Sequence, residues 1–446
     1  MNLRRLIARG AGRARVIATR EHILPLDDFA RASCLADRAA DLAGRSAILI
    51  VRDMATAAAA LIELDSLARR IVLCPPGWGV PEIEAAARDA EADAIVHDRD
   101  EATAIRLPLA VPCGLPLRAS EAPRAAARET EWILPTSGTS GPPKLVVHTL
   151  RTLTGAIGEV PSQEWATFYD IRRYGGLQIF LRALSGQGSL MLSGAGESVD
   201  SFLIRLGEAG ITHISGTPSH WRKVLMSAEA RRIDPVYVRL SGEIADDSVL
   251  EALRVFYPRA RVEHAYASTE AGVAFAVDDG KAGFPAAWLE RDGPVRMRIV
   301  EGALQIRSDR AAKNFLGATA PRLADADGFV DTGDMVERRG DRYAFVGRRG
   351  GIINVGGAKV HPEEVEAALN AHPAVRASRV FARKNPITGA LVMAEVVARD
   401  GVAREGLERE ILAACRARLP AHMAPAGLRF VADLPMTVAG KMARHG

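Results

Sequence analysis

The sequence predicts an α/β protein, and three observations support this fold class. Short apolar runs rich in β-branched residues alternate with alanine-rich stretches of helical period in the first part of the chain. After about Pro294 the pattern changes to the alternating residues of an antiparallel hairpin. Five glycines then fall within 347–357, and a helical pattern follows them. We therefore expect a large N-terminal domain of parallel sheets with helices at 1–349, with a β-rich subdomain at about 294–349, and a small α+β domain at 350–446.

The strands predicted for the N-terminal domain are short buried runs, and helices separate them. The strands are expected at 46–51, 69–74, 92–97, 187–193, 211–216, 237–242 and 260–268, with clear helices at 54–67 and 81–91. Strands and helices that alternate in this way form parallel sheets covered on both faces. The hairpin is expected at 295–308 around a Glu-Gly turn. Pro362, followed by acidic residues, marks the start of a helix in the C-terminal domain.

Composition excludes several classes of protein. The chain has 446 residues, 48% hydrophobic and 25% charged, as is typical of a soluble globular protein with two or more domains. The net charge of +4 does not indicate a nucleic-acid partner. No apolar stretch approaches the roughly 20 residues of a membrane span. The four cysteines, Cys34, Cys74, Cys113 and Cys415, are scattered without metal-ligand spacing, which favours buried thiols in a reducing cytoplasm.

The first twenty residues are rich in arginine and contain no acid before Glu21. Such a segment is compatible with an organelle transit peptide or a membrane-surface helix. The alternative is a frayed or docked terminal segment in a protein that uses much alanine and arginine. Both interpretations stay open at this point.

The stretch "ILPTSGTSGPPKLVVHT" (133–149) carries the strongest chemical signal. An apolar run breaks into a loop of hydroxyl, glycine and proline residues that ends on a lysine. Glycines allow consecutive N–H groups to converge on an anion, hydroxyls add donors, and the lysine adds charge. The candidate phosphate-binding residues are Thr136, Ser137, Gly138, Thr139, Ser140, Gly141 and Lys144. Only seven of the 58 basic residues are lysine, so a lysine at this place is informative. The alternative is a flexible Ser/Gly linker.

This stretch resembles the phosphate loop of the AMP-forming, adenylating enzymes, which include acyl- and aryl-CoA synthetases, peptide-synthetase adenylation domains and luciferase. Four further stretches resemble motifs of that family, in the family's order. They are "HAYASTEAG" (264–272), "DTGDMVERRGDRYAFVGRRGG" (331–351), "NVGGAKVHPEEVE" (354–366) and "PMTVAGKMAR" (435–444). Five motifs in order over about seven tenths of the chain make this resemblance specific.

The resemblance implies an enzyme that uses ATP and Mg²⁺ to activate a carboxylic acid. The acid attacks the α-phosphorus to give an acyl-adenylate and pyrophosphate, and a thiol then takes the acyl group and releases AMP. By resemblance, Lys441 bridges the acid and the α-phosphate, Thr269 donates to the α-phosphate, and Glu270 holds Mg²⁺. Asp334 would bind the ribose hydroxyls, and Arg348 would support ribose and phosphate.

Further residues are implied in the remaining parts of the site. Those expected near the adenine are Gly242, Glu243, Ile244, His264 and Tyr266. Those expected around the acid are Tyr169, Asp170, Tyr174, Gly175, Ser215, Gly216, Ala265 and Ala267. Gly356 and Gly357 would line a thiol channel, and Gly350 would be the hinge about which a mobile C-terminal domain rotates. Asp170 is open to two interpretations, a partner for a substrate ammonium or the cap of a helix beginning at Ile171.

The chain departs from the family at two of these positions. Gly350 stands where the family usually has an aspartate, so the hinge gains backbone freedom. His264 stands where many relatives have Asn or Asp, and its ring can still donate or accept. The stretch before the phosphate loop is also shorter than in typical relatives, which suggests a trimmed N-terminal part.

The first functional hypothesis is a cytoplasmic AMP-forming acid:CoA ligase for an aryl or acyl acid, with a homodimer as a further expectation. The alternative is a stand-alone adenylation enzyme that loads the phosphopantetheine of a separate carrier protein. A third hypothesis, a basic nucleic-acid-associated protein, depends only on the pI near 9.0 and the arginine-rich start.

Overall fold

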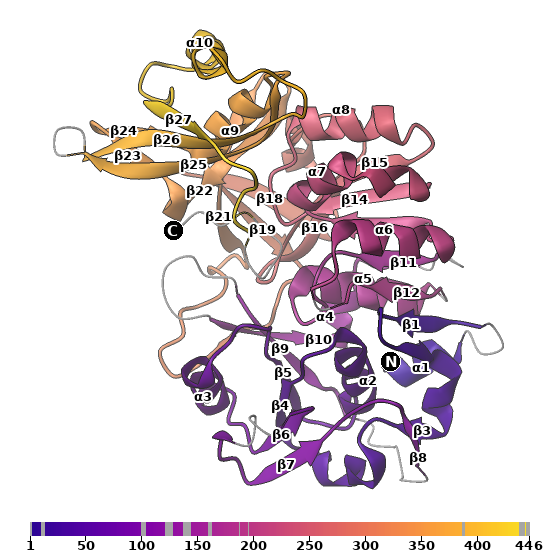
Figure 1. Ribbon diagram of the computed structural model, residues 1–446. Coiled ribbons are helices and arrows are strands. Elements are labelled where there is room, and N and C mark those ends of the chain that lie inside the picture. The colour runs from indigo at the N-terminus through magenta and orange to yellow at the C-terminus, as the bar shows by residue number, and fades with distance from the viewer. Residues whose placement is uncertain are drawn as a thin grey trace.

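The computed structural model describes residues 2–9, 14–99, 104–120, 128–136, 144–158, 163–186, 188–194, 196–385, 389–436 and 442. Two large sheets form the N-terminal part of the protein, and the C-terminal part lies beyond the second of them (Figure 1). The α/β class predicted from the alternating pattern is confirmed.

The first large sheet has seven strands. Their order is β20 (Phe315–Leu316), β10 (Leu145–Thr149), β9 (Glu131–Pro135), β5 (Arg70–Leu73), β4 (Ser46–Ile50), β6 (Ala94–His97) and β7 (Leu109–Pro112). From β9 to β7 all neighbours are parallel, whereas β10 and β20 join antiparallel. The strands expected at 46–51, 69–74 and 92–97 are confirmed. A separate pair, β3 (Ala32–Ser33) and β8 (Arg118–Ala119), lies outside this sheet.

The second large sheet has eight strands. Their order is β16 (Gly272–Val277), β15 (Arg261–Ser268), β14 (Tyr237–Ser241), β13 (His213–Gly216), β11 (Trp165–Thr167), β12 (Leu190–Leu192), β1 (Val16–Ala18) and β2 (Ile23–Pro25). The six strands from β15 to β1 are parallel, and β16 and β2 close the two edges antiparallel. The four later strands predicted from the sequence all lie in this parallel region.

Helices cover both faces of each large sheet, as parallel strands require. They are α1 (Leu3–Ala8), α2 (Met54–Leu64), α3 (Val80–Asp89), α4 (Leu150–Thr154), α5 (Tyr174–Ser185), α6 (Val199–Glu208), α7 (Pro218–Met226) and α8 (Asp247–Phe256). One core joins α1, α2 and α5 with residues of both sheets, so these helices lie between the sheets. The outer face of the first sheet is covered by α3, and that of the second by α6, α7 and α8 (Figure 1).

A third sheet is antiparallel and follows the eight-stranded sheet in the chain. Its order is β17 (Phe284–Pro285), β22 (Arg342–Arg348), β21 (Val330–Arg339), β19 (Ala303–Ser308) and β18 (Val295–Val300). The hairpin predicted at 295–308 is confirmed, with Val300 paired to Ala303 across the Glu-Gly turn. The sheet itself begins at Phe284, earlier than the change in pattern at Pro294, because β17 is too short to give a periodic signal.

The C-terminal part contains helices α9 (Pro362–Asn370) and α10 (Leu407–Arg418) and two small sheets. Strands β25 (Val375–Asn385), β26 (Gly389–Ala398) and β27 (Gly427–Phe430) form one sheet, and β23 (Ile353–Val355) and β24 (Ala358–Val360) form the other. These elements share one apolar core of their own. In the described part of the chain, short 3-10 helices lie at Leu26–Ala30, Ala36–Leu42, Ala228–Arg232, Ala286–Glu290 and Arg349–Gly351.

The arginine-rich start contributes a docked helix in residues 2–9. Leu3, Leu6 and Ile7 of α1 are buried in the core between the sheets, and the Leu3 N–H donates to Asp65 at 2.8 Å. This is the docked-segment alternative. All four cysteines are free and buried, as predicted. None of the helices formed by the described residues combines the length and apolar character that crossing a membrane requires.

Two adjacent glycines of α5 allow a stability test of how this helix begins. A Cβ on Gly176 would lie 2.2 Å from the Asp170 carbonyl oxygen, whereas a Cβ on Gly175 would touch only the Tyr169 ring, at 3.7 Å. We expect Gly176→Ala to lower the free energy of unfolding by about 2 kcal/mol, because the backbone must move to relieve the clash. Gly175→Ala is the matched control and should unfold at the wild-type urea concentration or slightly above it. Equal midpoints for the two variants in urea titrations would contradict this packing.

Candidate active site

The predicted phosphate loop joins the antiparallel strands β9 and β10. Its two ends are paired: the Thr136 N–H donates to the Lys144 carbonyl at 2.9 Å, and the Lys144 N–H lies 3.3 Å from Thr136 Oγ1. The Lys144 ammonium lies 5.4 Å from the centroid of the Phe315 ring of β20. Five other predicted members of the loop, Ser137, Gly138, Thr139, Ser140 and Gly141, lie outside the described residues.

Thr269 and Glu270 lie on the turn that joins β15 to β16. Ser268 Oγ accepts the Ala271 N–H at 2.9 Å and closes the turn. Gly272 has φ +77, and a Cβ there would lie 2.4 Å from the Arg310 carbonyl oxygen, so this position requires glycine. The Glu270 carbonyl accepts the Ala312 N–H at 2.9 Å. The backbone of the turn is therefore fixed, and the half-buried Glu270 carboxylate is not needed to hold it.

His148 connects the phosphate-loop strand to this turn. It lies on β10, fully buried, and its Nε2 donates to the Thr269 carbonyl at 2.6 Å, while Nδ1 lies 2.9 Å from Thr152 Oγ1. Burial lowers the pKa of His148 to about 4, so the ring is neutral at pH 7. The ring of Tyr174 lies against it, with centroids 5.5 Å apart. The sequence analysis missed His148, because only its neighbours along the chain were weighed.

The strand β15 separates two faces of the site. Its side chains alternate, so Ala265 and Ala267 face one side of the sheet while His264 and Tyr266 face the other. Ala267 packs against the core between the two sheets, and Tyr266 packs against the core of the third sheet. The residues implied for the acid and for the nucleotide are thus on opposite faces of one strand.

On the nucleotide side, Tyr266, Asp334 and Arg348 form one network. The Tyr266 hydroxyl donates to Asp334 Oδ2, and Arg348 Nε lies 3.1 Å from Asp334 Oδ1. Burial, followed by the charge of Asp334, raises the pKa of the Tyr266 hydroxyl, which therefore stays protonated. The Tyr266 ring stacks on Phe275 and Phe345, with centroids 5.4 and 5.0 Å away. The contacts with Tyr266 and Arg348 orient the Asp334 carboxylate, and its role toward the ribose hydroxyls stays a prediction.

His264 makes a contact that the sequence analysis did not foresee. Its Nε2 donates to the Lys281 carbonyl at 3.0 Å, and burial lowers its pKa. This bond fixes the tautomer, which leaves Nδ1 as the acceptor. A role toward the adenine stays a prediction.

On the acid side, Tyr169, Tyr174, Ser215 and Ala265 are all buried. The Tyr169 hydroxyl donates to the Ser241 carbonyl at 2.7 Å. Ser215 Oγ has no hydrogen-bond partner among the described residues, which is unusual for a buried hydroxyl. A Cβ on Gly216 would lie 3.0 Å from the Phe168 ring, so the backbone passes close to that ring.

The interpretation of Asp170 as the cap of a helix beginning at Ile171 is wrong. The helix α5 begins at Tyr174, not at Ile171, and its N-cap residue, Arg173, makes no side-chain capping bond. Asp170 instead accepts the Arg172 N–H and Nε, each at 2.8 Å, and pairs with its Nη2. Arg172 in turn binds the Val51 carbonyl. The carboxylate is therefore already balanced, which leaves it little capacity for a substrate ammonium.

The stretch that includes Gly242, Glu243 and Ile244 follows β14. Gly242 has φ +81 and lies exposed, while Glu243 and Ile244 are half-buried. Glu243 Oε2 accepts the Ser219 N–H of α7 at 3.0 Å, and Oε1 accepts the Met442 N–H at 2.9 Å. Lys441 lies outside the described residues, but Met442, which follows it in the chain, thus contacts the N-terminal part of the protein.

The glycines assigned to hinge and thiol channel lie at the start of the C-terminal part. Gly350 belongs to the 3-10 turn after β22, and Gly356 (φ +56) and Gly357 (φ +87) form the turn between β23 and β24. A Cβ on any of the three would meet nothing within 4 Å. Their roles in motion and thiol access stay predictions. Among the residues that the structure describes, no cluster of three His, Cys, Asp or Glu could hold a metal ion by itself.

Comparisons with known proteins agree with this geometry. The AMP-binding enzyme profile matches residues 54–300, and the profile of the AMP-binding enzyme C-terminal domain matches residues 364–441. The chain therefore belongs to the AMP-binding enzyme family.

Individual proteins support the same assignment. The chain is 29% identical over 345 residues to a probable nonribosomal peptide synthetase of Salinispora arenicola, covering 70% of this chain and 4% of that protein. It is 26% identical over 336 residues to the 2-succinylbenzoate–CoA ligase of Bacillus velezensis, covering 71% of this chain and 68% of the ligase. The fold is similar to that of an anthranilate CoA ligase in complex with anthranoyl-AMP, with a TM-score of 0.82 at 19% identity, over 99% of this chain and 95% of that one.

The neutral state of His148 gives the stability of the protein a defined pH dependence. The folded-state pKa of His148 is about 4 and its ordinary value is 6.5, so below about pH 6.5 the unfolded chain binds a proton that the folded chain excludes. The free energy of unfolding should fall by about 2 kcal/mol between pH 8 and pH 5 from this residue alone.

His148→Gln, whose amide can still donate to the Thr269 carbonyl, should remove that part of the pH dependence in urea titrations at several pH values. Burial also lowers the pKa of His220 to about 4. His220 should therefore contribute a pH dependence of similar size, which stays in the His148→Gln variant. The variant His422→Gln, at an exposed position, is the control. An unchanged pH dependence in His148→Gln would show that the ring is not held neutral by burial.

Proposed function

We propose that this protein is an AMP-forming acid:CoA ligase that acts on an aryl or acyl acid. The observation that supports this most is a convergence. The His148 bond joins the strand that ends the predicted phosphate loop to the Thr269–Glu270 turn. The Glu243 bond joins the N-terminal part to Met442, which follows Lys441 in the chain. These are the residues that an adenylating enzyme needs around one triphosphate.

The first step joins two anions, the carboxylate and the α-phosphate. A carboxylate is already ionised at neutral pH, so the reaction requires no general base. It requires fixed donors and cations that neutralise charge in the transition state. Lys144 at the loop and Lys441 near the chain end supply cations, and the Thr269 hydroxyl supplies a donor. The carboxylate oxygen attacks the α-phosphorus, and pyrophosphate leaves with the electrons of the broken P–O bond.

Glu270 fits the expected Mg²⁺ as its single protein carboxylate. Magnesium in nucleotide sites is held by one or two carboxylates together with phosphate oxygens and water, so a cluster of protein ligands is not expected. When bound, the ion neutralises the charge on the phosphates. The fixed turn that carries Glu270 keeps its carboxylate beside the place where the phosphates would lie.

In the second step the thiol of CoA attacks the acyl carbon, loses its proton, and AMP leaves. The alternative acceptor is the phosphopantetheine of a separate carrier protein. The peptide-synthetase relative favours that alternative, whereas the CoA ligase relative favours CoA. Free buried cysteines are consistent with a cytoplasmic enzyme. We retain a homodimer as an expectation that light scattering can test.

A panel of acids tests the proposed function. The protein is incubated with ATP, Mg²⁺ and one acid at a time, and acid-dependent pyrophosphate release is measured. Aryl acids such as anthranilate and 2-succinylbenzoate are the first choice, because relatives and fold neighbours are named for them. CoA or a phosphopantetheinylated carrier is then added, and the thioester formed identifies the acceptor. Absence of pyrophosphate release with every acid would argue against the proposal.

Replacement of the second lysine separates the two steps. Lys441→Ala should lower the rate of acyl-adenylate formation by about 100-fold or more, because its charge acts in the transition state of that step. Thioester formation from supplied acyl-adenylate should stay within about twofold of wild type. The control is Lys384→Ala, an exposed lysine on β25 of the same C-terminal part, which should leave both rates unchanged. Equal loss in both steps would contradict the assigned role of Lys441.

A further inference from the structure

The side chain of Glu243 joins two parts of the chain that are 199 residues apart. Its Oε2 accepts the Ser219 N–H at 3.0 Å, and its Oε1 accepts the Met442 N–H at 2.9 Å. Ser219 is in the first turn of α7, where backbone N–H groups have no partner within the helix. One carboxylate oxygen thus binds within the N-terminal part, and the other binds the Met442 N–H, which follows Lys441 in the chain.

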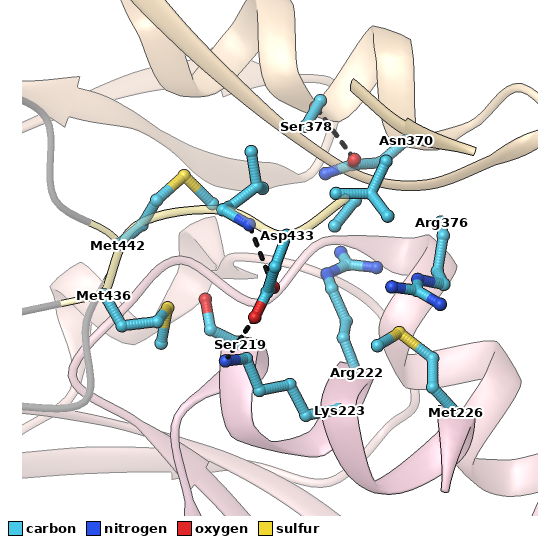
Figure 2. Close-up of a pocket in the computed structure, with 13 residues that line it drawn as sticks. Ser219, Arg222, Lys223, Met226, Asn370, Arg376, Ser378, Asp433, Met436 and Met442 are labelled. Atoms are coloured by element: carbon cyan, nitrogen blue, oxygen red, sulfur yellow. Dashed lines mark hydrogen bonds and ion pairs between the residues drawn. The ribbon is translucent and has the colours of Figure 1, made fainter. Parts of the chain in front are cut away.

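The surface on which the chain end docks is incompletely packed. A pocket lies between α7, represented by Ser219 and Lys223, and the C-terminal segment, represented by Asp433, Met436 and Met442 (Figure 2). The Lys223–Asp433 ion pair crosses it at 3.4 Å, with the two side chains 31% and 65% exposed. Exposed pairs of this kind contribute little to stability. The contact between Ser248 Oγ and the Asn370 carbonyl is long, at 3.4 Å.

The Glu243 bond differs from these contacts in strength and in place. A carboxylate that accepts a backbone N–H makes a charge-assisted hydrogen bond, which is stronger than a neutral one. Met442 follows Lys441 directly and also bridges back to Met436 in an antiparallel pair. A bond at Met442 therefore restrains the backbone beside the lysine that the proposed first step uses.

We propose that Glu243 is a positioning residue that latches the chain end onto the N-terminal part for acid activation and releases it for the thioester step. The effect on acid activation rests on the proposed function. The Glu243–Met442 contact can be tested without it. Glu243 is half-buried, so water can replace the Met442 N–H when the chain end leaves. A single bond of this kind biases two arrangements without locking one of them.

The latch can be tested without any enzymatic activity. The four native cysteines are buried, so cysteines introduced at exposed Val255 of α8 and Arg409 of α10 can be labelled with a dye pair. In single-molecule energy transfer, Glu243→Ala should lower the ratio of docked to undocked molecules by about tenfold or more. Asp433→Asn removes the exposed ion pair at the same surface and is the matched control, with an expected change below about threefold. An unchanged ratio in Glu243→Ala would overturn the proposal.

The two half-reactions give an independent readout. Glu243→Ala should slow acyl-adenylate formation about tenfold or more, with the KM for ATP within about twofold of wild type. Thioester formation from supplied acyl-adenylate should be unchanged or faster. Glu243→Gln, whose one amide oxygen can still accept from Met442, should recover part of the first rate.

Other outcomes each overturn a different statement. A raised KM for ATP with a normal maximal rate would place Glu243 against the nucleotide instead. Equal loss in both half-reactions together with a lower melting temperature would assign it a purely structural role at α7. If no acid supports pyrophosphate release, the proposed function fails, and the dye-pair ratio still decides whether the latch exists.

Discussion

The site depends on a junction between two sheets, where a buried hydrogen bond of His148 lies beside backbone hydrogen bonds. The strands β9 and β10, which the predicted phosphate loop joins, belong to the seven-stranded sheet, and the Thr269–Glu270 turn follows β15 of the eight-stranded sheet. His148 Nε2, on the first sheet, donates to the Thr269 carbonyl on the second at 2.6 Å. Backbone hydrogen bonds lie beside it. The Ala312 N–H donates to the Glu270 carbonyl, and the Lys313 N–H donates to the Val147 carbonyl. A displacement of either sheet would separate the phosphate loop from the turn, so this junction sets the geometry of the whole site.

The same constraint explains why the helix α5 has its particular start. It lies between the two sheets, and a residue with a side chain at Gly176 would collide with the Asp170 backbone. The turn before the helix is fixed by Arg172, which binds Asp170 and reaches the Val51 carbonyl in the first part of the chain. Tyr174, the first residue of α5, then packs against the His148 ring. The packing at the junction therefore also fixes the position of Tyr174, one of the residues implied for the acid.

Local sequence pattern was sufficient to predict the α/β class and many of the buried strands, because hydrophobic periodicity marks buried strands and the helices that pack on them. The sequence also identified the apolar run that leads into the predicted phosphate loop. The sequence could not predict the start of α5. Asp170 binds Arg172, whose guanidinium also binds the Val51 carbonyl, and this contact with a distant part of the chain is not visible in a local pattern. It missed His148 for the same reason, since both partners of a buried ring are visible only in three dimensions. The resemblance implies a place near the adenine for Glu243, which stays a prediction, while the bonds of its side chain to the Ser219 and Met442 N–H groups are visible only in the structure.

The strength of the contacts across the two parts of the protein fits a reaction with two chemically different steps. In the proposed reaction, acid activation uses Lys441 beside the α-phosphate, whereas thioester formation needs a path for a thiol to the acyl carbon. A tightly packed interface would favour the first arrangement permanently. The described contacts there include the Arg339–Glu364 ion pair between β21 and α9, an exposed ion pair, a long hydrogen bond and a carboxylate bond, beside a pocket. Such an interface costs little to open, because water replaces each polar partner. The free-energy difference between arrangements can then be set by the bound reactants, which change from step to step.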